Sequence, residues 1–146
     1  MVSTAPYQSK ETRLALCDRS PHHGGVDGAW WPRALDLRAE LPDLVCILSL
    51  RIGPVRRVLY DPIAWPLAPA RVLRGTTLVS VDPYSMVASD TIYLMGTHSR
   101  DAVLFVVAPE SAVAQARCVL RSVSGATEPL DVAMLRRLVD ACGCVS

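Results

Sequence analysis

Ala102-Val103-Leu104-Phe105-Val106-Val107-Ala108 is the stretch of sequence that decides the fold. A strand this apolar cannot lie with one face in water, so both of its faces must be covered. Thr76–Val81 and Thr91–Gly96 come before it as further strands. Turn signals at Asp82-Pro83-Tyr84-Ser85 and Ser99-Arg100-Asp101 separate the three segments. Three closely spaced strands with turn-like links predict an antiparallel meander.

A helix is predicted directly after the apolar strand. Pro109-Glu110-Ser111 supplies its start, and Gly125 is its natural stop. Between them the apolar residues recur at helical spacing and form one stripe, which comprises Ala112, Val113, Ala116, Val119, Leu120 and Val123. The pattern indicates an amphipathic helix with a single face toward the core.

An earlier helical pattern begins near Ala34 and ends at Gly53-Pro54. Its apolar face comprises Leu35, Leu41, Leu44, Val45 and Leu48. Pro42 interrupts the pattern. Because proline removes a backbone donor and clashes with the preceding turn, we expect the helix to kink or split there.

The remaining strands are predicted at Thr12–Asp18, at Val55–Asp61, and at Val72–Leu73, which forms a bent strand or short pair with Thr76–Val81. The order of strand, helix, run of strands and helix predicts an α+β domain. We expect a curved antiparallel sheet of about five to six strands with two main helices packed on one face.

Three segments divide the chain. Residues 1–11 are polar and predict a flexible arm, and residues 12–125 form the single α+β domain. Residues 126–146 predict a C-terminal accessory helix or tail, with weak helical spacing at Asp131–Ala141. With both main helices on one sheet face, the other face stays free, so either the sheet curls on itself or a second subunit covers it. We expect a homodimer, because two-fold dimers are the commonest soluble assembly.

Composition excludes several classes of protein. The chain has 146 residues, of which 51% are hydrophobic and 20% charged, and this excludes disorder as the state of the whole chain. A net charge of +1 provides no strong field for nucleic acid or acidic membranes. Its apolar runs fall short of the roughly 20 residues of a membrane span, and the N-terminus has no apolar signal segment. We therefore expect a soluble, cytoplasmic protein.

The five cysteines are an odd number, and their spacings do not make a disulfide framework. A reducing compartment fits them better. Cys17, Cys46 and Cys118 each lie among aliphatic residues, and the prediction is that they are small buried hydrophobes. Cys142-Gly143-Cys144 is expected to be a frayed end of the chain.

The candidate binding residues cluster in Asp27-Gly28-Ala29-Trp30-Trp31-Pro32-Arg33. Neighbouring tryptophans outside a helix point in different directions, so one can join the core while the other covers a pocket. In the functional hypothesis the indoles stack on a ligand, Asp27 accepts a hydrogen bond and Arg33 binds an anion. In the structural hypothesis the indoles plug the core, while Asp27 or Asp36 pairs with an arginine or caps the next helix.

Trp65 lies in Pro62-Ile63-Ala64-Trp65-Pro66-Leu67-Ala68-Pro69, a loop that its prolines stiffen. It forms either the second wall of a groove opposite Trp30 or Trp31, or a lid over core residues.

Several of these residues also carry a resemblance. Val26–Arg33, followed by Leu37 and Glu40-Leu41-Pro42, resembles a family of small actinobacterial domains of unknown function that carry a D-G-A-W-W-P-R motif. Val55–Tyr60, followed by Trp65 and Pro69, extends the likeness, which covers roughly Arg13 to Gly125. The resemblance implies a cytoplasmic actinobacterial protein and no particular activity.

Catalysis and metal binding have weaker support. The histidines, His22, His23 and His98, lack metal-ligand spacing, so we expect no metal. Nucleophile and phosphate-loop motifs are missing from the sequence, and we expect no cofactor. An enzyme would use Asp27 as base, His22 or His23 as acid and Arg33 as anion clamp.

The last alternative is nucleic-acid binding through a stripe of Arg51, Arg56, Arg57, Arg71 and Arg74, which the near-neutral total charge disfavours. The leading hypothesis is a non-catalytic ligand- or partner-binding, regulatory domain. It would use Asp27, Trp30, Trp31, Arg33 and Trp65 in a groove between the two tryptophan-bearing loops. The partner is an unknown small molecule or protein, and no catalytic residue is assigned.

Overall fold

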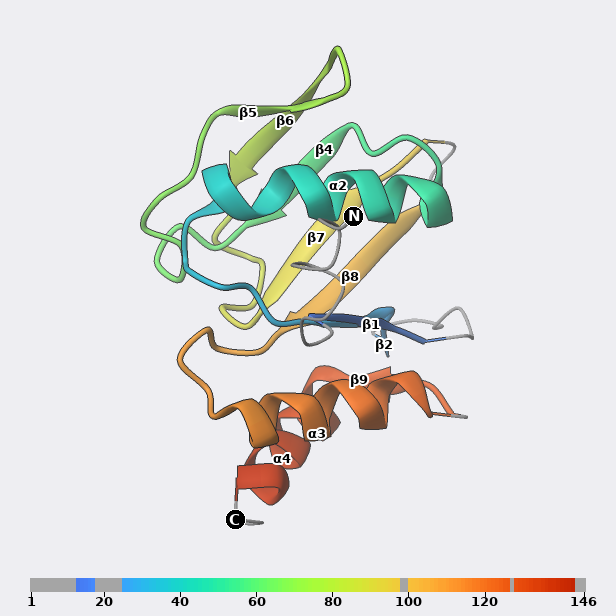
Figure 1. Cartoon of the computed structure of the whole chain (residues 1–146). Helices are drawn as coiled ribbons and strands as arrows, with labels where there is room; N and C mark the ends of the chain where they lie inside the picture. The colour runs from blue at the N-terminus through green and yellow to red at the C-terminus, as the bar shows by residue number, and fades with distance from the viewer. Residues whose placement is uncertain (1–12, 18–24, 98–99, 127, 144–146) are drawn as a thin grey trace, which may run out of the picture.

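The computed structural model describes residues 13–17, 25–97, 100–126 and 128–143 (Figure 1). Its strands are β1 (Leu14–Leu16), β2 (Gly25–Val26), β3 (Gly28–Trp30), β4 (Arg57–Tyr60), β5 (Arg71–Arg74), β6 (Thr77–Pro83), β7 (Thr91–Met95), β8 (Asp101–Val106) and β9 (Leu130–Asp131). Its helices are α2 (Leu37–Ile52), α3 (Val113–Ser124) and α4 (Val132–Gly143). The predicted arm, residues 1–11, lies outside the described residues.

In the described ranges, seven strands form one sheet in the order β1-β3-β8-β7-β4-β6-β5, and β2 pairs with β9 separately. The α+β class is confirmed, but the predicted antiparallel sheet of five to six strands is wrong. β3 runs parallel to β8, and β4 runs parallel to β6, so the sheet is mixed. Of the predicted meander only the antiparallel pair of β7 and β8 forms, because β4, which comes earlier in the chain, lies between β6 and β7.

The apolar strand β8 lies inside the sheet and is covered on both faces. Ala102, Leu104 and Val106 belong to the core under α2. Phe105 and Val107 belong to a second core under α3. Figure 1 shows α2 on one side of the strands and α3 with α4 on the other. The prediction that both main helices pack on one face is therefore wrong.

This arrangement removes the argument for a second subunit, because α3 and α4 of the same chain cover the far side of β8. One part of that second face has no helix over it in the described part of the chain, namely the part formed by β7, β4, β6 and β5. Leu73 and Leu78 are paired there and are 56% and 58% exposed. A homodimer stays a prediction, and this part of the face is where a partner would find apolar surface.

Helix α2 begins after Asp36, whose Oδ1 accepts the Arg38 N–H at 3.0 Å. The aspartate thus caps the helix, as the structural hypothesis allowed. The helix runs without a break through Pro42, so the predicted split does not occur. It ends at Gly53, whose φ of 80° is a left-handed conformation that favours glycine.

Helices α3 and α4 form a layer that the sequence predicted only in part. Ala116, Val119, Leu120 and Val123 of the predicted stripe are buried. Cys118 of α3 and Cys142 of α4 form a disulfide, so the prediction that the cysteines form no disulfide framework is wrong for this pair. Cys142 is buried in α4, so the prediction that it belongs to a frayed end is wrong as well. The disulfide also weakens the argument for a reducing compartment. No helix among the described residues is both long and apolar enough to cross a membrane.

Candidate functional site

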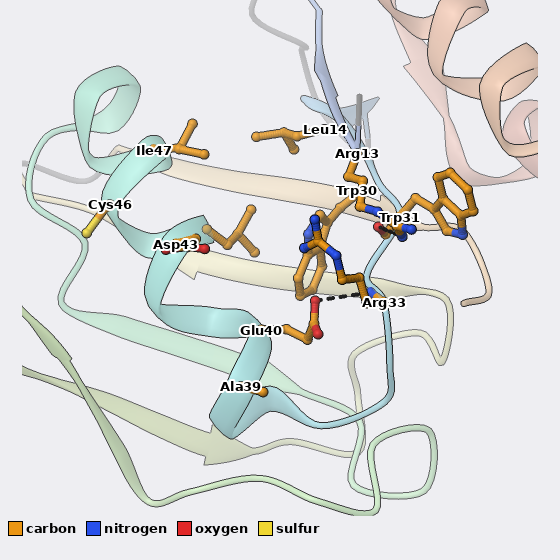
Figure 2. Close-up of a pocket in the computed structure, with 11 residues that line it drawn as sticks. Arg13, Leu14, Trp30, Trp31, Arg33, Ala39, Glu40, Asp43, Cys46 and Ile47 are labelled. Carbon is orange, nitrogen blue, oxygen red and sulfur yellow. Dashed lines mark hydrogen bonds between the residues drawn. The ribbon is translucent and has the colours of Figure 1, made fainter. Parts of the chain in front are cut away.

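Trp30 and Trp31 lie on opposite sides of the sheet, as expected for neighbours in a strand. Trp30 belongs to the core under α2, and Trp31 belongs to the core under α3. Both side chains are almost fully buried. Figure 2 shows the Trp31 indole turned away from the groove that Trp30 faces.

Trp65 lies behind Trp30. The two indoles stack with centroids 5.6 Å apart, and Trp65 is 2% exposed. Asp61 fixes the loop, since its Oδ1 accepts the Ile63 N–H and its backbone oxygen accepts the Trp65 N–H. Of the two hypotheses for Trp65, the geometry matches a residue packed over the core, and the proline-rich loop does not line the groove described below.

Trp31 ties three segments together. Its Nε1–H donates to the Pro109 carbonyl at 3.4 Å, and the Arg13 guanidinium lies 4.1 Å from the ring centroid. Arg13 Nη1 also donates to the Trp31 carbonyl at 3.2 Å. The cation over the indole and the hydrogen bonds fix Trp31 between β1 and the start of α3.

Asp27 is buried away from Trp30 and Arg33, between β1 and β8. Its backbone N–H donates to the Val103 carbonyl at 2.8 Å, and its Oδ2 accepts the Val103 N–H at 2.9 Å. The side chain thus continues the parallel pairing of β3 and β8 by one residue. Burial raises the pKa of the Asp27 carboxyl, while the Val103 hydrogen bond and the Arg51 charge oppose the rise.

Between β3 and the exposed side of α2 lies a cavity of about 700 Å³, called here the β3–α2 groove. Its volume falls in the range of small-molecule sites. The β1 segment contributes Arg13 and Leu14, the β3 segment contributes Trp30, Trp31 and Arg33, and α2 contributes Ala39, Glu40, Asp43, Leu44, Cys46 and Ile47. Of the five predicted site residues, Trp30, Trp31 and Arg33 line the groove, although the Trp31 indole points to the other side of the sheet, and Asp27 and Trp65 do not line it.

The charges of the groove come from opposite walls (Figure 2). Glu40 Oε1 accepts the Arg33 backbone N–H at 3.1 Å, which holds the turn after β3 against α2. Within the described ranges the Arg33 guanidinium and the Asp43 carboxylate form no ion pair, either with each other or with another side chain. Both are exposed, so the groove offers a cation and an anion to a ligand.

Sequence reasoning missed the α2 wall. Cys46 was predicted to be buried, but it is an exposed thiol that lines the groove. The helical period contains the signal. Leu44, Val45 and Leu48 face the core, so Asp43, Cys46 and Ile47 must face outward.

Four of the five arginines of the predicted stripe have separate partners within the described residues, and the Arg71 side chain has none there. Arg51 donates to the Cys17 carbonyl, Arg56 to the Gly96 carbonyl and Arg74 to the Val55 carbonyl. Arg57 Nε lies 2.7 Å from Asp82 Oδ2, and with a hydrogen bond from Ser80 it lowers the pKa of Asp82.

His22, His23 and His98 lie outside the described residues. Among those that are described, no group of histidine, cysteine, aspartate or glutamate side chains could hold a metal ion.

A smaller apolar hollow of about 420 Å³ lies on the other side of the molecule, over β4 and β7. The loop between β6 and β7 forms its rim, where Tyr84 and Met86 are 49% and 78% exposed. Apart from hydroxyls its lining is apolar, so it lacks the charges of the β3–α2 groove.

Fold and site together define a small α+β protein whose mixed sheet carries helices on both faces and a ligand-sized groove beside one of them. Residues 13–123 match the model of the DUF5994 family, a family of unknown function, and the chain belongs to that family. Membership in a family of unknown function is thereby confirmed, while an actinobacterial origin stays a prediction. Neither the curated proteins nor the solved structures contain a match to this chain.

Proposed function

We propose that the chain is a non-catalytic binding domain that takes a small organic ligand in the β3–α2 groove. One observation carries the proposal: a cavity of about 700 Å³ brings the Trp30 indole together with charged groups that have no ion-pair partner in the described part of the chain. An apolar surface with a few polar groups is the usual composition of a ligand site. Burying part of a ligand against Ile47, which is 46% exposed, and against the accessible edge of Trp30 would supply affinity, and Arg33 would orient an anionic group.

The enzyme alternative has less support. Its base, Asp27, lies outside the groove, and the Val103 N–H occupies one of its carboxylate oxygens. Glu40, a carboxylate in the groove, accepts the Arg33 backbone N–H and, among the described residues, does not pair with a second titratable side chain that could share a proton with it. A general base must reach the proton that it removes, and Asp27 does not line the groove in which the ligand is proposed to bind.

Nucleic-acid binding also has less support, because Arg51, Arg56, Arg57 and Arg74 each donate to a group of the same chain. Binding the phosphates of a nucleic acid requires arginine or lysine side chains that are free to contact successive phosphates.

Binding of anilinonaphthalene sulfonate, a dye with flat rings and one anionic group, tests the proposal. The dye's fluorescence is titrated with the full chain and with two matched variants of α2. Ala39→Trp places an indole inside the groove, and Leu50→Trp places one on the same helix at a residue that is 90% exposed and does not line the groove. Both substituted residues lie on the helix surface, so both variants should fold.

We expect the wild type and Leu50→Trp to bind the dye equally, and Ala39→Trp to lose most of the binding. Equal binding by all three would place the dye elsewhere, for example in the apolar hollow over β4 and β7, and would contradict the proposal. No binding by the wild type would contradict it as well.

A further inference from the structure

We propose that the ligand of the β3–α2 groove is a small zwitterion, with an acidic group at one end, an amine at the other and an apolar body between them. This inference rests on the proposed function and adds the chemical class of the ligand. It follows from three features of the groove: a cation on one wall, a carboxylate on the other and an apolar floor.

The cation is Arg33. Its backbone is held by Glu40, and its side chain reaches into the groove beside Trp30 (Figure 2). A guanidinium presents a planar fork that matches a carboxylate. Arg13 lines the same groove but already stacks on Trp31, so Arg33 is the cation that an acid would meet.

The anion is Asp43, which lies across the groove on α2 (Figure 2). It follows Glu40 by three residues, so the two carboxylates share one helix face. Arg33 and Asp43 line one cavity and carry opposite charges, yet they form no ion pair with each other in the described structure. The space between them suits a ligand that bridges both.

The floor between these charges is apolar. Ile47 of α2 supplies most of this surface, since it is 46% exposed, and the nearly buried Trp30 and Leu44 lie beside it. A simple acid would satisfy Arg33 but leave the carboxylate of Asp43 without a cation. A diacid would bring its second charge toward Glu40 and Asp43, which repel it. The groove therefore favours a zwitterion over both.

Four probes of equal chain length test the inference: aminohexanoate, hexanoate, hexylamine and adipate. Cys46 is an exposed thiol in the groove, so a bound probe should slow its alkylation by iodoacetamide. Peptide mapping by mass spectrometry assigns the alkylation to Cys46, and its dependence on probe concentration gives the affinity. We expect aminohexanoate to bind about tenfold more tightly than hexanoate or hexylamine, and adipate to bind no better than hexanoate.

Two variants assign the ends of the probe. Arg33→Gln should reduce aminohexanoate binding to the level of hexylamine, and Asp43→Asn should reduce it to the level of hexanoate. Arg38→Gln is the matched control, because Arg38 is an exposed arginine at the start of α2 that does not line the groove. Rates with and without probe are compared within each variant, since Asp43 lies one turn from Cys46 and affects its reactivity directly.

The inference is overturned if aminohexanoate binds no better than hexanoate, or if Asp43→Asn leaves its advantage unchanged. If aminohexanoate shows no advantage but Ala39→Trp still loses the dye and Leu50→Trp still binds it, only the zwitterion is excluded and the proposed function stands. If the dye shows no dependence on the groove, both fail.

Discussion

The indole of Trp65 supports the indole of Trp30 from behind, with the two ring planes 16° from parallel. Trp30 ends β3 and faces the groove, whereas Trp65 belongs to the loop that follows β4. The stack therefore connects the groove floor to a segment more than thirty residues later in the chain. A pair of offset rings contributes beyond the area that it buries.

Trp65→Ala should lower the free energy of unfolding, and it should weaken ligand binding in the groove indirectly. Removing a buried tryptophan costs about 3–5 kcal/mol, because the lost contacts leave a cavity. Urea denaturation measures the free energy of unfolding. Ile63→Ala is the control, since Ile63 lies in the same loop but is 90% exposed and should change stability by less than about 0.5 kcal/mol. Equal stability of the two variants would contradict the anchoring role of Trp65.

Gly28→Ala should destabilise the sheet although Gly28 does not have a left-handed conformation. A Cβ at this position would overlap the Ala15 carbonyl oxygen and approach Leu16 Cδ2 at 2.9 Å, because β1 and β3 pair closely there. Forcing atoms into a packed site costs about 1–3 kcal/mol. Gly28 lies in the stretch of candidate binding residues, and the structure gives it a role in strand pairing.

Gly125→Ala is the matched control for thermal unfolding. A Cβ there would have its nearest neighbour, the Arg121 carbonyl oxygen, at an ordinary distance of 3.5 Å. We expect the melting temperature of Gly28→Ala to fall by several degrees and that of Gly125→Ala to stay close to the wild type. A wild-type melting temperature for Gly28→Ala would show that β1 can move away at little cost.

Loss of the Cys118–Cys142 disulfide should destabilise the layer of α3 and α4. The two cysteines are 24 residues apart in the chain. Without the bond the unfolded chain gains conformational entropy, which lowers the free energy of unfolding by about 3 kcal/mol in the chain-entropy model. Cys118→Ala combined with Cys142→Ala should show this loss in urea denaturation without reductant. Cys46→Ala, which removes an exposed free thiol, is the control and should be neutral.

Reductant provides the complementary measurement. Dithiothreitol should lower the stability of the wild type to that of the double variant and should leave the double variant unchanged. If reductant leaves the stability of the wild type unchanged, the two cysteines are not joined in solution.

Local patterns predicted the elements but not their neighbours. The apolar stripe of α3 and the apolar character of β8 can be predicted from the sequence, because helical spacing and unbroken apolar runs depend on nearby residues. The parallel pairing of β3 with β8 joins Gly28 to Leu104, and no local signal specifies a partner that distant. As a result, the sequence leaves a curled sheet and a second subunit as alternative covers for β8, whereas in the structure α3 covers it within the chain.

The site shows the same division. Trp30, Trp31 and Arg33 were found because they are consecutive or nearly so. Asp43 was available from the helical period, but its place opposite Arg33 depends on how α2 packs against β3. Asp27 is close to the tryptophans in sequence, but it lies just before β3 and its side chain accepts the Val103 N–H of β8.

Substitutions of Asp27 should separate its hydrogen bond from its charge. Asp27→Ala leaves the Val103 N–H without its acceptor and should cost about 1–3 kcal/mol. Asp27→Asn keeps an acceptor oxygen and removes the buried charge, so at neutral pH it should be at least as stable as the wild type. Urea denaturation at a series of pH values measures both effects.

The pH dependence of Asp27→Asn relative to the wild type follows from the raised pKa of the carboxyl. Well below the ordinary value of 3.8, Asp27 is protonated in the folded and unfolded chains, so the difference in stability between the two proteins should not change with pH there. As the pH rises from 3.8 through the folded pKa, the unfolded chain loses its proton first, and the wild type should lose stability relative to Asp27→Asn. Above the folded pKa the difference should stay constant. A wild type that instead loses stability relative to Asp27→Asn as the pH falls would mean that the charged carboxylate stabilises the fold and that the Val103 hydrogen bond outweighs burial.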